Sequence, residues 1–190
     1  DLDVPKKLVQ GEAAMALAEN FLDFESPVML NVQPVPNAME MFGAFAAPHV
    51  CDGDSVLVLN GSVGRVTIEI AQLSSPSSIL HTDPTANTLD AFLYAKENSS
   101  IRFDRVIEGN ICKTEDVDFP AEWTQALAST SISVKQVDVF RLACDVMEPA
   151  DVVVVDLVQL NKLICSRRGQ IPPNLHVLVK PGGRLVMQRG

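Results

Sequence analysis

Two continuous apolar runs constrain the fold of this chain more than any other feature of its sequence. They are SVLVLN at 55–60 and DVVVVDL at 151–157. A strand in which nearly every residue is apolar must be covered on both of its faces, which is the situation of a strand inside a parallel sheet between layers of helices. The two runs therefore predict an α/β fold.

Helical and strand-like patterns alternate through the rest of the chain. We expect further strands at 77–82, at 137–143, and after the Pro-Gly-Gly turn within 175–189. Helices are expected at 11–22, 37–47, 63–73, 85–97 and within 119–129, where Trp123 would be a packing anchor. This order predicts a doubly wound, mostly parallel sheet with right-handed crossovers. Residues 1–50 would form an N-terminal helical cap and 51–190 the α/β body, as one structural unit.

The overall charge and the apolar runs exclude some classes of partner. The net charge of −9 argues against non-specific binding of nucleic acid, which needs clustered Lys and Arg. No apolar run reaches the roughly 18 residues of a membrane-spanning helix.

Histidine and cysteine residues are scattered and predict no metal site. The four cysteines form no CxxC pair, which disfavours both a zinc site and a secreted disulfide framework. They predict free thiols in a reducing compartment, either the cytoplasm or the interior of an organelle. The residues concerned are Cys51, Cys112, Cys144, Cys165, His49, His81 and His176.

The stretch VLVLNGSVGR at 56–65 reads as a strand, a glycine loop and the start of a helix. Gly61 and Gly64 lack the side chain that would block close approach of a ligand, and the following helix offers free N–H groups. The same glycines are also what a tight strand-to-helix turn requires, so both interpretations stay open. A dinucleotide-binding GxGxxG pattern is disfavoured because Leu59 occupies its first glycine position.

Four motifs in order carry a resemblance to a known group. VLVLNGSVGR, ILHTDP, ADVVVVDL and LVKPGGRLVM resemble the motif series of class I S-adenosylmethionine-dependent methyltransferases. More narrowly, VPNAMEMFGAF, GSVGRVTIEIA, RVIEGNI, FRLACDV and VQLNKLI are similar to the mercaptohistidine N-methyltransferase family, whose members make the last methylation of ovothiol. The resemblance implies a Rossmann-like methyltransferase fold that here lacks the usual C-terminal hairpin.

The resemblance also implies where a cofactor and a substrate would lie. Asp83 would bind the ribose hydroxyls, although Asp83-Pro84 is also a typical helix start. Asp156, at the end of a strand, would line a substrate pocket or cap the next helix. The full candidate set is Gly61, Ser62, Gly64, Asp83 and Asp145 for the cofactor, and Asp156, Gln159 and Asn161 for the substrate. No catalytic residue is assigned.

Three positions depart from the family pattern. Val58 and Leu142 stand where the family has acids, and Asn60 stands where it has a glycine. If each lost acid costs about 2 kcal/mol, the affinity for S-adenosylmethionine falls by roughly a thousandfold. Asn60 is a milder change because Asn tolerates positive φ, and Asp145 is a possible replacement for the acid missing at Leu142.

These departures favour a non-catalytic methyltransferase-like protein that serves as a structural or assembly subunit, with doubtful cofactor binding and no metal. The alternative is an active S-adenosylmethionine-dependent N-methyltransferase with a small, mercaptohistidine-like substrate. The final strand at 184–188 would have an unpaired apolar edge, so we expect a protein partner there unless the natural chain continues.

Overall fold

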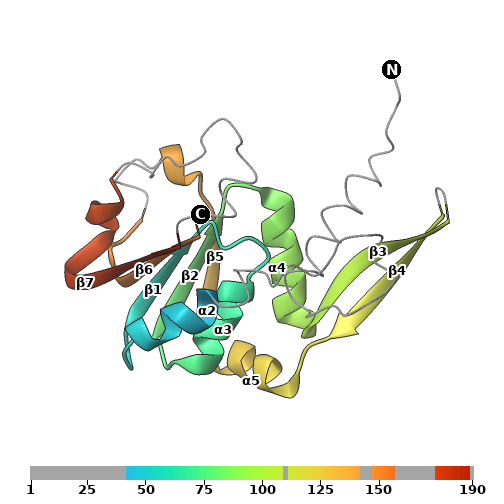
Figure 1. The fold of residues 1–190 in the computed structure, drawn as a ribbon, viewed down its shortest axis with the longest axis horizontal. Coiled ribbons are helices and arrows are strands. Elements are labelled where there is room, and N and C mark those ends of the chain that lie inside the picture. The colour runs from blue at the N-terminus through green and yellow to red at the C-terminus, as the bar shows by residue number, and fades with distance from the viewer. Residues whose placement is uncertain (1–41, 109–110, 142–146, 157–173, 189–190) are drawn as a thin grey trace.

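The structure is a computed structural model, and it describes residues 42–108, 111–141, 147–156 and 174–188. Its centre is a five-stranded sheet in the order β5-β2-β1-β6-β7, in which every neighbouring pair is parallel (Figure 1). The strands are β1 Ser55–Leu59, β2 Ser78–Asp83, β5 Ile132–Gln136, β6 Ala150–Asp156 and β7 Val179–Gln188. This order confirms the predicted doubly wound, mostly parallel sheet.

The two apolar runs form the central strands β1 and β6. Val56 and Val58 of β1 pack into one hydrophobic core, and Leu57 and Leu59 pack into the other. All four side chains are buried. Because both faces of β1 are covered, the continuous apolar pattern is required, as predicted.

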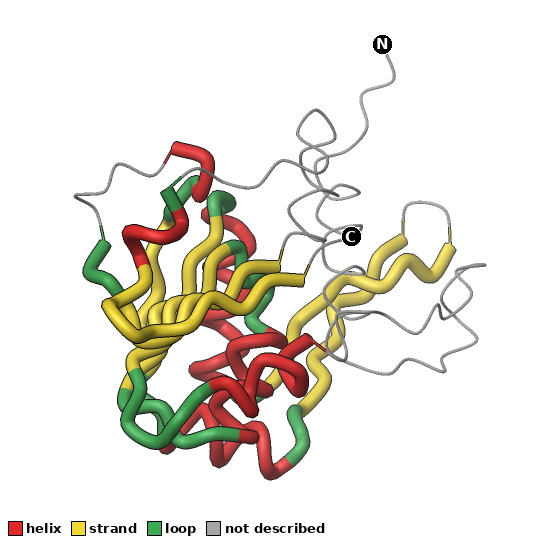
Figure 2. Tube along the Cα trace, turned by 60° about the vertical axis from the view of Figure 1, so that its left-hand side comes forward, coloured by secondary structure: helices red, strands yellow, loops and turns green. Residues whose placement is uncertain are grey.

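The α-helices that the structure describes pack on one face of the sheet (Figure 2). They are α2 Phe42–Ala46, α3 Arg65–Leu73, α4 Ala86–Asn98 and α5 Ala121–Ser129. Short 3₁₀ helices η3 Val139–Arg141 and η5 Leu175–Leu178 contribute to the core on the other face, and η2 Ala47–His49 follows α2. The predicted helix at 11–22 lies outside the described residues. None of the helices described is long and apolar enough to span a bilayer.

The strand predicted at 137–143 is wrong, because β5 ends at Gln136. The N–H of Val137 still donates to the Asp83 carbonyl, at 3.0 Å. The Asp138 carboxylate then accepts the Phe140 N–H at 3.0 Å, which turns the chain into η3. β5 is an edge strand whose burial alternates, so it lacks the continuous apolar run of a central strand.

A hairpin that the sequence patterns did not predict extends from the α/β body between α4 and α5 (Figure 1). Its antiparallel strands are β3 Ser100–Glu108 and β4 Ile111–Asp118. Arg102 donates to both carboxylate oxygens of Asp116, at 3.0 and 3.1 Å, and its guanidinium lies 4.4 Å from the centre of the Tyr94 ring of α4. Tyr94 also donates to Asp116, so these three side chains fasten the base of the hairpin to α4.

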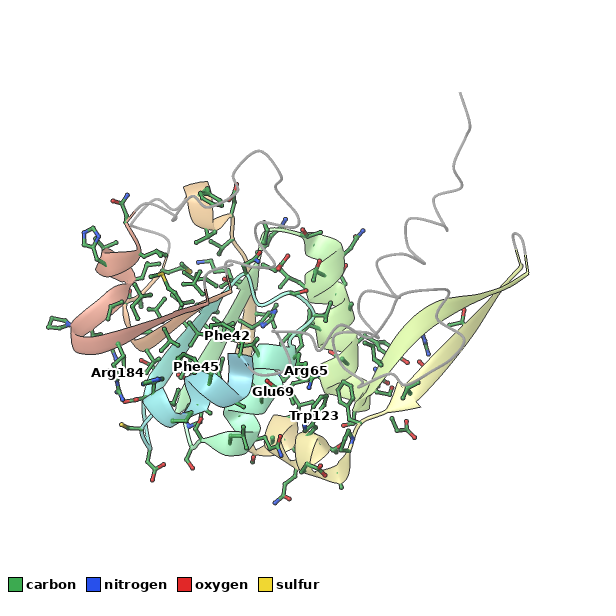
Figure 3. All side chains as sticks on the ribbon, in the orientation of Figure 1. Phe42, Phe45, Arg65, Glu69, Trp123 and Arg184 are labelled. Atoms are coloured by element: carbon green, nitrogen blue, oxygen red, sulfur yellow. The ribbon has the colours of Figure 1, made fainter. Side chains whose placement is uncertain are left out.

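Trp123 anchors α5 against α3, as predicted. Its side chain is buried and packs edge-on against Phe119 at 5.6 Å. The Arg65 guanidinium lies 5.7 Å from the Trp123 ring centre and pairs with Glu69 at 2.7 Å, in the interior between α2, α3 and α5 (Figure 3). A Cβ on Gly43 of α2 would overlap the Glu69 side chain, so the helices approach closely here.

Candidate functional site

The carboxyl ends of the parallel strands meet at one edge of the sheet, where α/β proteins bind ligands. The chain runs from β1 to β2 on one side of β1, and β6 lies on its other side, so the strand order reverses at β1. Three features gather at this edge: the loop at 60–64 after β1, Asp83 at the end of β2, and Asp138 just after β5.

The loop has left-handed backbone at every second residue. Asn60 has φ 57°, Ser62 has φ 51° and Gly64 has φ 96°. Glycine adopts this conformation freely, whereas other L-residues do so at a cost of about 1–2 kcal/mol. Asn60 takes this backbone, as expected of Asn. Ser62 takes it as well, although it has a side chain.

β2 holds the loop through His81. The Nε2 atom lies 3.0 Å from the Ser62 carbonyl oxygen, and Nδ1 lies 2.8 Å from Oγ1 of Thr67 on α3. A carbonyl only accepts, so Nε2 carries the hydrogen and Nδ1 accepts from the Thr67 hydroxyl. Burial lowers the pKa of His81 to about 4, partly opposed by the Ser62 hydrogen bond, so the ring is neutral at pH 7. Phe92 of α4 packs on the ring, with centroids 4.2 Å apart.

Asp83 binds the N–H side of Ser62, whose carbonyl is bound by His81. Its Oδ2 accepts the Ser62 N–H at 3.1 Å, and its Oδ1 accepts the Thr85 N–H at 2.9 Å. The residue is fully buried, and this burial raises the pKa of Asp83 against the opposing effect of both hydrogen bonds. α4 begins at Ala86 with Thr85 as its N-cap, so the helix start expected at Asp83-Pro84, with Asp83 as N-cap, is wrong by two residues.

Packing explains why both Gly61 and Gly64 of the loop must be glycine. A Cβ on Gly61 would overlap the His81 ring, and a Cβ on Gly64 would overlap the Phe92 ring. The Gly61 N–H donates to the Thr82 carbonyl at 2.8 Å, and the Gly64 N–H closes the turn onto the Gly61 carbonyl at 3.0 Å. The glycines thus let β2 and α4 approach the loop closely, whatever binds above it.

The structure brings four of the predicted site residues together: Gly61, Ser62, Gly64 and Asp83. Asp156 ends β6, which places its backbone at the same edge of the sheet. Asp145, Gln159 and Asn161 lie outside the described residues, and so does Leu142. Val58 is fully buried and in register with His81 and Val154, so β1 carries no carboxylate at this position.

Sequence patterns missed three residues of this edge. Thr67 and His81 become neighbours only when α3 packs on β2, and no spacing in the sequence marks that contact. Asp138 could have been found, because an acid follows the alternating segment ISVKQ at 132–136 by one residue. Among the described side chains, no group of three or more His, Cys, Asp or Glu gathers to hold a metal ion.

A second polar cluster lies at the opposite, amino edge of the sheet. The Asp151 carboxylate accepts from the Ser55 hydroxyl at 2.6 Å, the Ser55 N–H at 2.9 Å and Lys180 Nζ at 2.9 Å. The Ser55 and Lys180 hydrogen bonds hold the pKa of Asp151 well below its usual range. The cluster joins the starts of β1, β6 and β7, so we interpret it as a clamp between strands.

Solved structures that resemble this fold include S-adenosylmethionine-dependent methyltransferases. The glycopeptide N-methyltransferase MtfA, complexed with S-adenosyl-L-homocysteine, aligns with a TM-score of 0.50 and 19% identity over 78% of this chain and 50% of MtfA. A methyltransferase from Geobacter sulfurreducens in complex with S-adenosyl-L-homocysteine aligns with a TM-score of 0.51 and 12% identity over 98% of this chain and 56% of its own.

This chain therefore has a methyltransferase-like fold and spans about half the length of these structures. At such identities the likeness shows the fold alone. No protein-family model matches the sequence, and no curated protein matches it.

Proposed function

We propose that this protein is an S-adenosylmethionine-dependent methyltransferase whose cofactor binds at the carboxyl edge of β1, β2 and β5. The observation that carries the proposal is the pair of carboxylates on neighbouring strand ends, Asp83 and Asp138, beside the left-handed loop. β5 ends at Gln136, so Asp138 is the acid next to this strand end, and the proposal assigns it to the cofactor. The loss inferred at Leu142 stays untested, because that residue lies outside the described ranges.

The residues present fit an adenosine cofactor with a positive charge. Ribose hydroxyls and the adenine amino group are hydrogen-bond donors, and a carboxylate offers about four acceptor positions. Asp83 uses some of these for Ser62 and Thr85. The loop at 60–64 would lie under the methionine part of the cofactor. When bound, the cofactor supplies a methyl group on a sulfonium centre. Orientation of an imidazole or amine nitrogen and exclusion of water would be the contribution of the chain.

Calorimetric titration with S-adenosylmethionine and S-adenosylhomocysteine tests the proposal. We expect micromolar binding by the native protein and at least about tenfold weaker binding by Asp138→Asn. Asn keeps the acceptor for the Phe140 N–H, so this variant removes charge without removing the turn. Asp90→Asn, on the exposed side of α4, is the matched control and should bind like the native protein. Absence of binding at millimolar cofactor would reject the proposal.

The second candidate is a non-catalytic assembly subunit, and two observations favour it. Val58 fills the place of an acid on β1, and Asp83 is fully buried with both oxygens engaged inside the protein. The partner surface would be the edge strand β7, where Leu185 and Met187 are each 38% exposed. A native protein that binds neither cofactor, yet unfolds cooperatively, would favour this candidate.

A further inference from the structure

We propose that His81 is the positioning residue of the loop at 60–64: from β2 it holds Ser62 in the left-handed conformation that shapes the ligand-binding edge. The contribution to ligand affinity rests on the proposed function. The hold on the loop stands on the geometry of the described residues alone.

Ser62 needs to be held because its backbone conformation is unfavourable for a residue with a side chain. The N–H of Ser62 belongs to the peptide group before its Cα, and the carbonyl belongs to the peptide group after it. Asp83 binds the first at 3.1 Å and His81 binds the second at 3.0 Å. Since both flanking peptide groups are fixed, φ and ψ of Ser62 are fixed too.

The His81 ring is itself fixed on three sides. Thr67 holds Nδ1, Phe92 packs on one face, and Gly61 leaves the space that the ring occupies. A side chain that only filled the core would need no donor directed at the loop. The imidazole instead links α3 to Ser62 through one chain of hydrogen bonds, so the position of α3 is transmitted to the loop.

A loop fixed before binding loses less conformational entropy when a ligand arrives. β1 supplies no carboxylate beside this loop, because Val58 is buried in the core. The neighbouring strand therefore does the anchoring, and the loop depends on β2 for its shape.

A matched pair of variants distinguishes the effect of the His81 hydrogen-bond donor from the effect of its side-chain volume. His81→Leu removes the donor, whereas His81→Gln retains an N–H group at similar length. Amide hydrogen exchange at Ser62 and calorimetric affinity for S-adenosylhomocysteine are measured on both, with the exposed residue His176 of η5, changed to Leu, as control. Thr67→Val, which loosens the ring without removing it, is the milder variant if His81→Leu does not fold.

We expect His81→Leu to accelerate amide exchange at Ser62 and to weaken ligand binding about tenfold. The affinity of His81→Gln should lie within about threefold of the native value. Adding Ser62→Gly should restore most of the affinity lost in His81→Leu, because glycine adopts the left-handed backbone unaided. A folded His81→Leu protein with native exchange at Ser62 overturns the proposal. If the native protein binds no cofactor, the proposed function fails, and the exchange comparison still decides whether His81 holds the loop.

Discussion

Gly64 shows how one residue satisfies two constraints at once. Its φ of 96° favours glycine, and a Cβ there would overlap the Phe92 ring. We predict that Gly64→Ala lowers the free energy of unfolding by about 2–4 kcal/mol, from backbone strain and overpacking together. Gly53 has φ 83° with open space around it, so Gly53→Ala should cost only about 1 kcal/mol. Urea denaturation measures both, and equal losses would contradict the Phe92 overlap.

His81 makes a prediction about pH. In the unfolded chain its pKa is near the ordinary 6.5, and burial lowers it to about 4 in the folded protein. As pH falls from 6.5 towards 4, the unfolded state takes up a proton that the folded state does not, so the free energy of unfolding falls, by about 3 kcal/mol in total. The groups in contact with the ring, from Ser62, Thr67 and Phe92, are neutral.

Comparing native protein with His81→Gln isolates this effect. Asp83 titrates in the opposite direction: its raised pKa lets the folded state take up a proton first, which stabilises it as pH falls just above the ordinary value of 3.8. That contribution is common to both proteins. Denaturation at several pH values should show a stability difference that narrows towards acid, and parallel curves would contradict a buried neutral His81.

At the residue scale, the sequence could indicate the loop and Asp83 but not how they are held. Gly61, Gly64 and Asp83 follow strand-like runs, and the ends of parallel strands meet at one edge. The positive φ of Ser62 and the contact between His81 and Thr67 arise from tertiary packing. The loss of an acid at Leu142 stays a prediction, because this residue lies outside the described ranges.

At the element scale, α3 carries a buried ion pair. The side chains of Arg65 and Glu69 are 9% and 8% exposed. We predict that Glu69→Gln costs about 3 kcal/mol of unfolding free energy, because it leaves the charge of Arg65 in the interior without its carboxylate. The double variant Arg65→Met/Glu69→Leu should recover most of that loss. The exposed pair of Arg102 and Asp116 is the control, and Asp116→Asn should have a much smaller effect.

Elements with a strong pattern were predicted, and those at edges were not. β1, β6, α3, α4 and α5 match their expected positions to within about two residues. β5 is amphipathic and, among the described strands, pairs with β2 alone, so its sequence signal is weak beside the apolar residues of 137–143. The β3–β4 hairpin has its partners within itself and on α4, which leaves no long apolar run to mark it.

At the scale of the whole molecule, ligand binding should stabilise the fold through linkage. With S-adenosylhomocysteine at a hundred times its dissociation constant, the free energy of unfolding should rise by about 2.7 kcal/mol. Thermal unfolding with and without the ligand measures the rise. With tenfold weaker binding, the rise at the same ligand concentration should fall to about 1.4 kcal/mol in Asp138→Asn and stay near the native value in Asp90→Asn. An unchanged midpoint in the native protein would favour the non-catalytic candidate.

The mostly parallel sheet follows from the sequence, because alternating strands and helices imply helical crossovers between parallel strands. The order of the strands is known only from the structure. The partner predicted at 184–188 stays a prediction, and so does the reducing compartment. β7 does lie at the end of the sheet, with Leu185 and Met187 partly exposed on the face opposite Val186. No strand is paired to its outer side within the described ranges.

The position of Trp123 makes it an intrinsic fluorescence probe of the loop and α3. It is the single tryptophan of the chain, and it lies beside Arg65, the first residue of the helix that follows the loop. Its indole emission therefore depends on the local field of that guanidinium. A shift in the wavelength of maximum emission, recorded without any label, should follow displacement of the start of α3 when a ligand occupies the neighbouring edge.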